Sequence, residues 1–413
     1  MLIKIATKKY LIIAPLFYSI GDASEQINYG IARAKILGAK LLIIRPYRFT
    51  QILSYKICNK ALFEKINFCK YDFYDYFASL SLNFLYNLLF FIKRLLKKTI
   101  LKKFKFKKNE EWNFLYSGLR ELWPYHVDNI NQIIYDPIIR QIQIANNIEL
   151  KISHSQFNTF LSDHQLDRSS KYVCLHVREP GFHGDYSRKT YRNADIDTCN
   201  LAITFLIENN IAVIRMGDAL MKPLSIKHPL IIDYAISKYK SEEMDLALIK
   251  NCVFYIGMQA GIWDTALLFQ KPVLTINQYE WFAGYPLKVI DRCIFKKIKI
   301  NGKVLSNIER MKLPFHYTNN MVDFSDDIEI IDNNEYEILA AVKNYLNEFL
   351  DEFKSSNKYC DVNLKRFYDE RSLTLIKELL EIKNTTEFSV PYFHFGRILI
   401  RNRSSIGYAY KEI

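Results

Sequence analysis

The sequence predicts an α/β protein with two domains, each built on a parallel sheet. Apolar segments of strand length alternate with amphipathic helical segments over residues 10–44 and again over residues 171–277. This alternation is typical of parallel sheets that carry helices on their faces. A chain of 413 residues is longer than one core usually organises. Because 49% of the residues are hydrophobic and only 13 are glycine, disordered and fibrous classes are excluded.

The first strand–helix–strand unit covers residues 10–44. Its apolar run at 10–20 follows three lysines, as the apolar part of a signal peptide would. However, apolar residues then recur at helical spacing up to residue 37, and Gly38 stands where a helix C-cap glycine is expected. Residues 41–44 form a second apolar segment of strand length. We therefore interpret the beginning of the chain as a strand, a helix and a strand.

The second region predicts a doubly wound parallel sheet. Five strands are expected, at 172–177, 211–216, 230–233, 253–257 and 271–277, with helices between them. We assign residues 1–165 to an amino-terminal domain and 166–334 to a carboxyl-terminal domain. Residues 335–413 are expected to form a helical extension, with the helical pattern running to about residue 382.

The positive charge is concentrated in one stretch. The net charge is +13, and residues 93–108 contain nine Lys or Arg and no acid, so the rest of the chain carries only +4. This distribution does not indicate a nucleic-acid-binding face. The stretch follows an apolar run at 80–92 that is too short to span a bilayer.

We interpret residues 80–108 as a basic interfacial segment that contacts a membrane surface. The alternative is a core helix followed by a solvated basic helix.

The seven cysteines are dispersed, with no Cys-x-x-Cys pair. This cysteine usage fits a reducing cytoplasm. The expected location is therefore cytoplasmic and peripheral, on the inner face of the plasma membrane.

The carboxyl ends of the predicted strands carry the candidate binding residues, because open parallel sheets bind ligands at that edge. The residues are His176 and Arg178 at the end of the first strand, Arg215, Gly217 and Asp218 at the end of the second, and Gly257, Gln259, Gly261 and Asp264 at and beyond the end of the fourth. Guanidinium groups bind phosphate oxygens in bidentate fashion, and a helix that begins at Gly261 would offer backbone N–H groups to an anion. Asp218 or Asp264 could accept hydrogen bonds from ribose hydroxyls.

Several sites with known sequence patterns are absent. No G-x-G-x-x-G follows the first strand, no Walker A sequence occurs, and no Asp-x-Asp is placed to hold a metal on a diphosphate. The sequence therefore favours a diphosphate site without a metal or cofactor, neutralised by arginine. Structural roles stay open for the individual residues: Arg178 could form an ion pair, His176 could be a core histidine, and residues 192–195 could be a capped loop.

Four segments carry a family resemblance. They are His-Val-Arg at 176–178, YRNADI at 191–196, VIRMGD at 213–218 and YIGMQAGIWDTALLFQKPVLTIN at 255–277. Together they resemble a family of bacterial surface-polysaccharide glycosyltransferases. The His-x-Arg strand end also resembles, more distantly, the O-fucosyltransferase-like branch of the GT-B glycosyltransferases.

The resemblance implies a GT-B fold, in which two Rossmann-like domains face each other across a cleft. The carboxyl-terminal domain would bind a nucleotide-sugar, and the amino-terminal domain would face the acceptor. Arg178 and Arg215 would meet the donor diphosphate, and the cleft would be lined by His176, Tyr191, Arg192, Asn193 and Asp195. The family usually carries Ser where this chain has Gln259 or Ala260, so a hydroxyl contact to phosphate is not expected here.

The expected function is metal-independent transfer of a sugar from a nucleotide-sugar to a glycan or lipid-linked acceptor. Such a step needs a carboxylate that deprotonates the acceptor hydroxyl. The candidates for this base are Glu179, Asp185, Asp195 and Asp22. Two other classes remain: a non-catalytic nucleotide- or glycan-binding protein associated with a membrane, and a structural protein built around residues 80–108.

Overall fold

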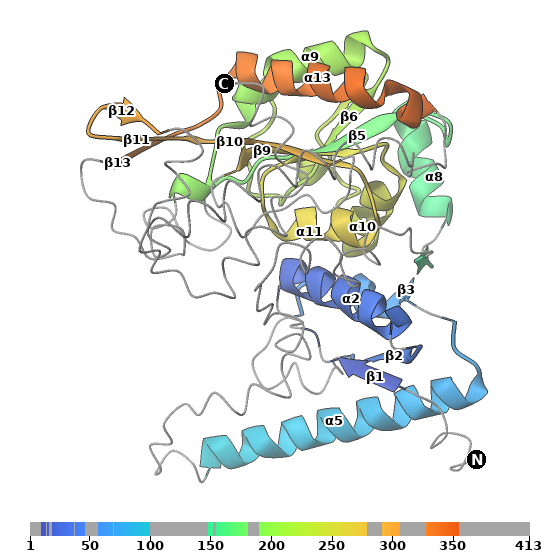
Figure 1. The fold of residues 1–413 in the computed structure, drawn as a ribbon. Helices are drawn as coiled ribbons and strands as arrows, with labels where there is room; N and C mark the ends of the chain where they lie inside the picture. Colours follow the sequence, from blue (N-terminus) through green and yellow to red (C-terminus); the bar gives the residue numbers. More distant parts are fainter. Residues whose placement is uncertain are drawn as a thin grey trace.

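The structure is a computed structural model that describes residues 10–13, 15, 19–36, 38–45, 57–68, 70–99, 148–151, 154–180, 190–278, 291–305 and 328–354. Its elements form stacked layers, with a six-stranded sheet at one end and the long helix α5 at the other (Figure 1).

The six-stranded sheet contains β5 (Tyr172–His176), β6 (Ala212–Arg215), β7 (Ile231–Ile232), β8 (Tyr255–Gly257), β9 (Val273–Gln278) and β10 (Arg292–Phe295). The strand order is β10-β9-β8-β5-β6-β7, and every neighbouring pair is parallel. Its strands are mostly buried and apolar, as expected of a sheet covered on both faces. The α/β class and the five expected strands are confirmed, and β10 is an additional strand.

Helices cover both faces of this sheet. The helices α9 (Asn200–Glu208) and α13 (Glu335–Lys354) pack on one face, and α10 (Glu242–Asn251) and α11 (Gly261–Leu268) lie on the other (Figure 1). The short helices η3 (Thr190–Arg192), η4 (Ile196–Cys199) and η5 (Tyr234–Ile236) occupy connections. A small antiparallel sheet follows β10, with β11 (Lys297–Ile300) between β12 (Lys303–Val304) and β13 (Ile328–Ile331).

The helix α13 belongs to the carboxyl-terminal core rather than to an extension. Its residues Ile338, Val342 and Tyr345 are buried in the same cluster as Val173 and Val213 of the sheet. Helical periodicity predicted the helix but could not show where its apolar face packs. The remainder of the expected extension, residues 355–413, lies outside the described residues.

The amino-terminal part contains the expected strand–helix–strand unit. The strand β1 (Tyr10–Ile13) is parallel to β2 (Lys40–Ile43), and α2 (Ile20–Ile36) connects them. The helix α5 (Phe73–Thr99) lies on the side of this pair away from α2 (Figure 1). Smaller elements are α4 (Lys60–Glu64), the antiparallel pair β3 (Ile66–Asn67) and β4 (Glu149–Leu150), and α8 (His154–Asp163). Among the described residues, no helix is both long and apolar enough to cross a bilayer.

The two parts meet where α2 crosses α11. A Cβ atom on Gly21 would lie 2.8 Å from the Cα atom of Gly261, so the absence of side chains lets the two helices touch. One turn further along, the hydroxyls of Ser24 and Thr265 form a buried hydrogen bond of 3.1 Å. One core cluster contains residues of α2, α10 and α11, so packing is continuous across the domain boundary placed at residue 165.

Candidate functional site at the carboxyl edge of the sheet

The strand order places a switch point between β5 and β8. From β5 the chain proceeds through β6 toward one edge of the sheet, and from β8 it proceeds through β9 toward the other. In open α/β sheets the crevice beyond the carboxyl ends of two such strands is where ligands bind. His176 and Gly257 end these strands and lie opposite each other. A Cβ atom on Gly257 would be 2.3 Å from the carbonyl oxygen of His176, so this close approach requires glycine.

Arg178 lies two residues beyond β5 and is held by the following loop. Its Nη1 donates a hydrogen bond to the Asn193 side-chain oxygen, and its carbonyl accepts a 3.0 Å hydrogen bond from the Ala194 amide. The Arg178 residue is 9% exposed. The predicted residues Arg178 and Asn193 are therefore brought together beside the switch point.

A second cation, Lys296, reaches the same asparagine and was not expected from the sequence. It follows β10 directly, and its Nζ donates to the Asn193 carbonyl at 2.6 Å and to Asp332 Oδ1 at 2.5 Å. Burial and repulsion from Arg178 lower the pKa of Lys296, while the bond to Asp332 acts in the opposite direction. The short run Cys293–Phe295 followed at once by Lys296 was the available signal in the sequence.

His176 is buried at the end of β5. Burial, together with the charges of Arg215, Lys240 and Arg178, lowers the pKa of His176 to about 3. Its Nδ1 has no hydrogen-bond partner among the described residues. A neutral imidazole adds no positive charge to the crevice, but its ring nitrogens can still donate or accept a hydrogen bond.

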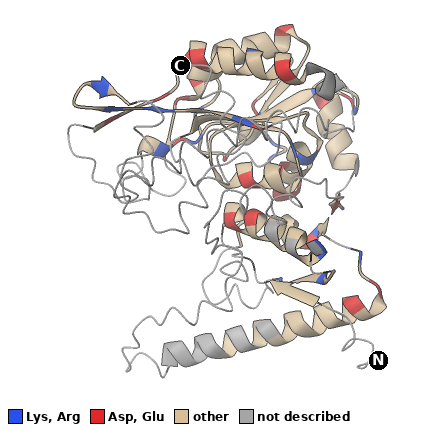
Figure 2. Cartoon of the chain, in the orientation of Figure 1, with Lys and Arg blue, Asp and Glu red and all other residues tan. Residues whose placement is uncertain are grey.

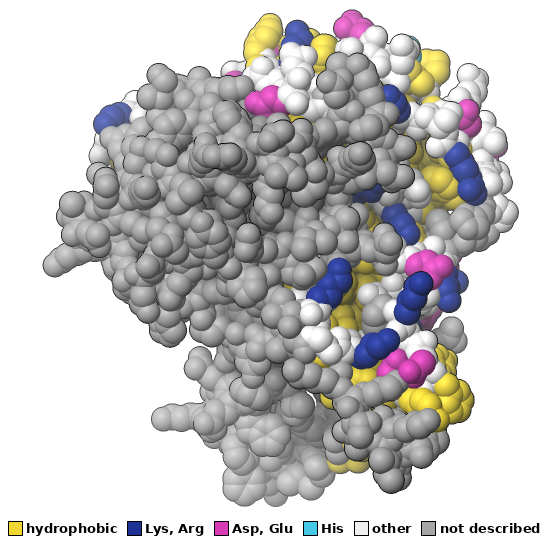
Figure 3. All heavy atoms as spheres, turned by 45° about the vertical axis from the view of Figure 1, so that its right-hand side comes forward, with side chains coloured by type: hydrophobic (Ala, Val, Ile, Leu, Met, Phe, Trp, Pro, Cys, Tyr) yellow, Lys and Arg dark blue, Asp and Glu magenta, His cyan; other side chains and the backbone are white. Residues whose placement is uncertain are grey.

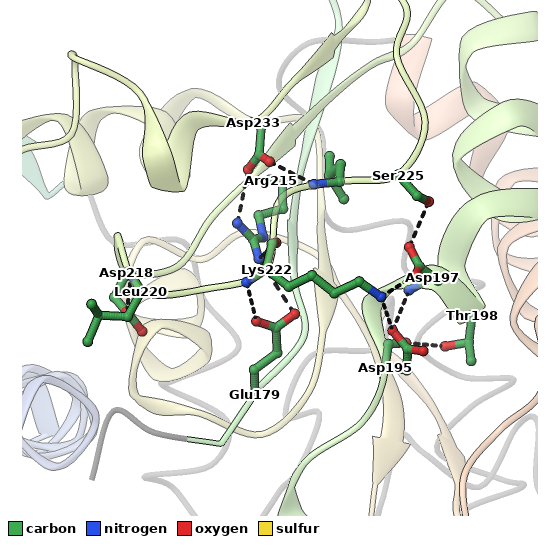
Figure 4. Close-up of polar contacts among 11 residues, drawn as sticks. Glu179, Asp195, Asp197, Thr198, Arg215, Asp218, Leu220, Lys222, Ser225 and Asp233 are labelled. Carbon is green, nitrogen blue, oxygen red and sulfur yellow. Dashed lines mark hydrogen bonds and ion pairs between the residues drawn. The ribbon is translucent and has the colours of Figure 1, made fainter. Parts of the chain in front are cut away.

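Arg215 has a different environment from the one expected for a diphosphate ligand. Its side chain is completely buried, and its guanidinium lies 2.9 Å from Asp233 and 3.6 Å from Glu179 (Figure 4). It also donates to the Lys222 carbonyl at 2.8 Å. Because these carboxylates neutralise it and no surface remains exposed, Arg215 is not available to a donor. Its role is to hold the loops after β5 and β6 together.

Three predicted acidic residues also make contacts within these loops. Glu179 accepts a 2.9 Å hydrogen bond from the Lys222 amide, and Asp218 accepts one of 2.8 Å from the Leu220 amide (Figure 4). Asp195 accepts from the Asp197 amide as the N-cap of η4 and lies 3.4 Å from Lys222 Nζ. These contacts fix the loops and occupy Glu179 and Asp195, two of the candidate bases.

Gly217 supports the same loop by having no side chain. Its φ is +149°, and a Cβ atom there would lie 2.1 Å from the Met221 sulfur. Any other residue would displace Met221, so we assign Gly217 a role in loop geometry.

The start of α11 is partly covered by α2. A Cβ atom on Gly261 would be 2.7 Å from Ile20 Cγ2, so an anion at this helix start would share the space with α2. Asp264 lies in the first turn of α11, and Gln259 accepts a 3.4 Å hydrogen bond from the Gln278 side chain. The first turn of α2 carries Asp22, which is exposed.

The remaining predicted residues have varied positions. Tyr191 is buried against Ile298 of β11, and Arg192 ends η3 and is half-buried. Asp185 lies outside the described residues. Among the side chains that the structure describes, no group of three or more His, Cys, Asp or Glu is placed to hold a metal ion.

Comparisons with known proteins found no matching family model and no matching curated protein. Among solved structures, a family 9 glycosyltransferase from Veillonella parvula has a TM-score of 0.39 and 11% identity. That match covers 82% of this chain and 97% of the other. The dodecameric iron-containing heptosyltransferase TibC, in complex with ADP-D-β-D-heptose, has a TM-score of 0.26 and 15% identity over 46% of this chain and 49% of its own.

A third match is MnaA from S. aureus in a structure with UDP. Its TM-score is 0.29 and its identity 11%, over 93% of this chain and 100% of its own. Because these TM-scores are low, the function proposed below rests on the sequence and on the geometry of the site.

Proposed function

We propose that this protein is a glycosyltransferase of the GT-B type that moves a sugar from a nucleotide-sugar to a glycan or lipid-linked acceptor. We place this reaction in the biosynthesis of a surface polysaccharide, such as capsule, O-antigen or lipopolysaccharide, on the inner face of the plasma membrane. One observation carries the proposal. Arg178 donates to the Asn193 side chain beside the switch point of a parallel sheet.

A cation at this position fits the charge that develops during transfer. The acceptor oxygen bonds to the anomeric carbon while the bond from that carbon to the diphosphate oxygen breaks. The electron pair of the breaking bond leaves with the nucleoside diphosphate. Fixed positive groups that face the departing diphosphate stabilise this charge without reorganising, which is why we propose transfer without a metal. Arg178 takes this role, and Asn193 positions its guanidinium.

We propose Asp22 as the base that takes the proton from the acceptor hydroxyl. Glu179 and Asp195 are engaged in the contacts that fix the loops. Asp22 is exposed at the start of α2, the helix of the amino-terminal part that crosses the start of α11. A base on this side matches an acceptor that approaches from the amino-terminal part.

The test replaces Arg178 and follows release of nucleoside diphosphate from a panel of nucleotide-sugars. We expect Arg178→Met to lower release at least a hundredfold, because the departing diphosphate loses a charge-assisted contact of about 3 kcal/mol. The matched control is Arg168→Met, since Arg168 is exposed and bonds Asn158 within the described residues.

Far-UV circular dichroism would show that both variants remain folded. Release at the wild-type rate by Arg178→Met would refute the assignment of Arg178. Saturable nucleotide-sugar binding without any release would favour the non-catalytic binding protein instead.

A further inference from the structure

The outward face of α5 is a continuous apolar stripe. Tyr76, Leu80, Phe84 and Leu88 follow one another at intervals of four residues, and the side chains of Leu80 and Phe84 are 53% and 57% exposed. Five further exposed or partly exposed apolar residues widen this stripe: Phe73, Phe77, Leu85, Phe91 and Ile92. Large apolar side chains gathered in one exposed patch mark a surface that binds a protein or a membrane.

The inward face of α5 is polar, which is the reverse of an ordinary surface helix. The side chain of Asn83 donates to the Ile43 carbonyl at 3.2 Å and also accepts from the Arg45 amide. Asn87 donates to the Arg45 carbonyl at 2.9 Å. These asparagines hold α5 on β2 and the residues after it, so the exposed apolar residues of the stripe lie on the side away from β2.

The distribution of charge along α5 favours binding to an anionic surface. Asp75 is the one acid in the helix sequence, and it is buried, with Tyr10 donating to it at 3.0 Å and Lys40 at 3.4 Å. Figure 2 shows the described length of α5 as uncharged beyond its first turn. At its carboxyl end the helix enters the basic stretch, with Lys93, Arg94 and two further lysines inside its bounds.

The position of α5 in the molecule also leaves its exposed face accessible. It is the outermost layer at the end of the molecule away from the six-stranded sheet, and its axis runs along that end (Figure 1). Hydrophobic side chains gather at the lower edge of the molecule in Figure 3, on the side where α5 begins. At 27 residues the helix is about 40 Å long, so it presents an extended surface at this end of the molecule.

We propose that this face of α5 docks flat on an anionic lipid bilayer, with the apolar stripe inserted among the acyl chains near the headgroups. Aromatic and aliphatic side chains on one face with lysines beside them are typical of interfacial helices, and each lysine near an anionic surface adds attraction. The docking face therefore begins at Phe73, earlier than the segment 80–108 expected from the sequence. Docking is independent of glycosyl transfer, so the two proposals can fail separately.

The experiment measures co-sedimentation of the full chain with vesicles of phosphatidylcholine alone and with added phosphatidylglycerol. The test variant replaces Tyr76, Leu80, Phe84 and Leu88 by Gln, which keeps helix propensity. The matched control replaces three exposed apolar residues elsewhere by Gln: Ile236, Val304 and Tyr336. Circular dichroism and light scattering report the fold and mass of each protein.

We expect the wild type and the control to bind the phosphatidylglycerol vesicles equally, and the α5 variant to bind at least tenfold more weakly. Release of nucleoside diphosphate in solution should be the same for all three. Four results would overturn the proposal. They are no binding by the wild type, equal binding by the α5 variant, equal binding to vesicles of phosphatidylcholine alone, and a wild-type dimer that only the α5 substitutions dissociate.

Discussion

His176 ends β5, and Arg178 and Arg215 lie close to it beside the proposed donor site. Its imidazole is buried beside Arg215 and Arg178, and these surroundings lower its pKa to about 3. A protonated imidazole here would add a third cation to a region of low dielectric constant. The neutral ring can instead hydrogen-bond an acceptor or donor group without competing for the diphosphate.

The lowered pKa predicts a specific dependence of stability on pH. The unfolded chain protonates His176 near its ordinary pKa of about 6.5, whereas the folded chain resists protonation down to about 3. The unfolded state therefore binds more protons between these values. The free energy of unfolding should fall as pH decreases below 6.5, by up to about 1.4 kcal/mol per pH unit from this group.

The measurement is urea unfolding of the wild type and His176→Gln between pH 7 and pH 5. Because glutamine does not titrate, the variant should lose less stability over this interval than the wild type does. Parallel curves for the two proteins would contradict the assignment of a lowered pKa to His176.

Among the elements, the crossing of α2 and α11 joins the two parts of the molecule. The backbones touch at Gly21 and Gly261, the Ser24 and Thr265 hydroxyls bond beyond the crossing, and Asn28 accepts a 3.5 Å hydrogen bond from Gln270. Small and polar residues thus line the α2 side at positions three and four apart. This spacing keeps them on one helix face and allows close packing.

Gly21→Ala should loosen this crossing. The added methyl would lie 2.7 Å from Asp264 Oδ2 and 2.8 Å from Gly261 Cα, and the backbone of α11 cannot yield without moving the helix. Overpacking of this kind costs about 1–3 kcal/mol of unfolding free energy. Urea unfolding measures the loss. The control is Gly38→Ala, which meets nothing within 4 Å but has a φ of +58°, and should cost about 1 kcal/mol. A smaller loss for Gly21→Ala than for Gly38→Ala would contradict the close crossing.

At the scale of elements, the sequence was informative wherever an apolar strand was bounded by turns and followed by an amphipathic helix. The strand β10 was missed because it begins with Arg292 and is followed by Lys296. Arg292 is buried but pairs with Glu348 at 3.3 Å, and Lys296 pairs with Asp332. Such pairs form between segments far apart in the chain, so local pattern could not reveal that either cation was buried.

The same limitation explains why the sequence assigned the same role to the two arginines at strand ends. Arg178 and Arg215 have equivalent places in the sequence pattern, each at or just after the end of a buried strand. They differ because Arg215 is fully buried between Asp233, which follows β7, and Glu179, whereas Arg178 donates to the Asn193 side chain. Only the three-dimensional pairing of these strands separates a structural arginine from a candidate ligand.

On the scale of the whole molecule, layers connect the proposed donor site with the proposed membrane-docking face. The six-stranded sheet, α11, α2, the β1–β2 pair and α5 follow one another from one end to the other (Figure 1). The start of α2 adjoins the start of α11, and the β1–β2 pair separates α2 from α5. Under the proposed function, the acceptor would approach from the amino-terminal part, which carries Asp22 in the first turn of α2.

The central claim is that the carboxyl edge of the six-stranded sheet binds a nucleoside diphosphate through Arg178. The most direct measurement is thermal unfolding of the wild type, Arg178→Met and Arg168→Met with the diphosphates of adenosine, guanosine, uridine, cytidine and thymidine. A ligand at 100 times its dissociation constant adds about 2.7 kcal/mol to the free energy of unfolding. At least one diphosphate should therefore stabilise the wild type and Arg168→Met but not Arg178→Met. Stabilisation of no protein by any diphosphate, or equal stabilisation of all three, would contradict the claim.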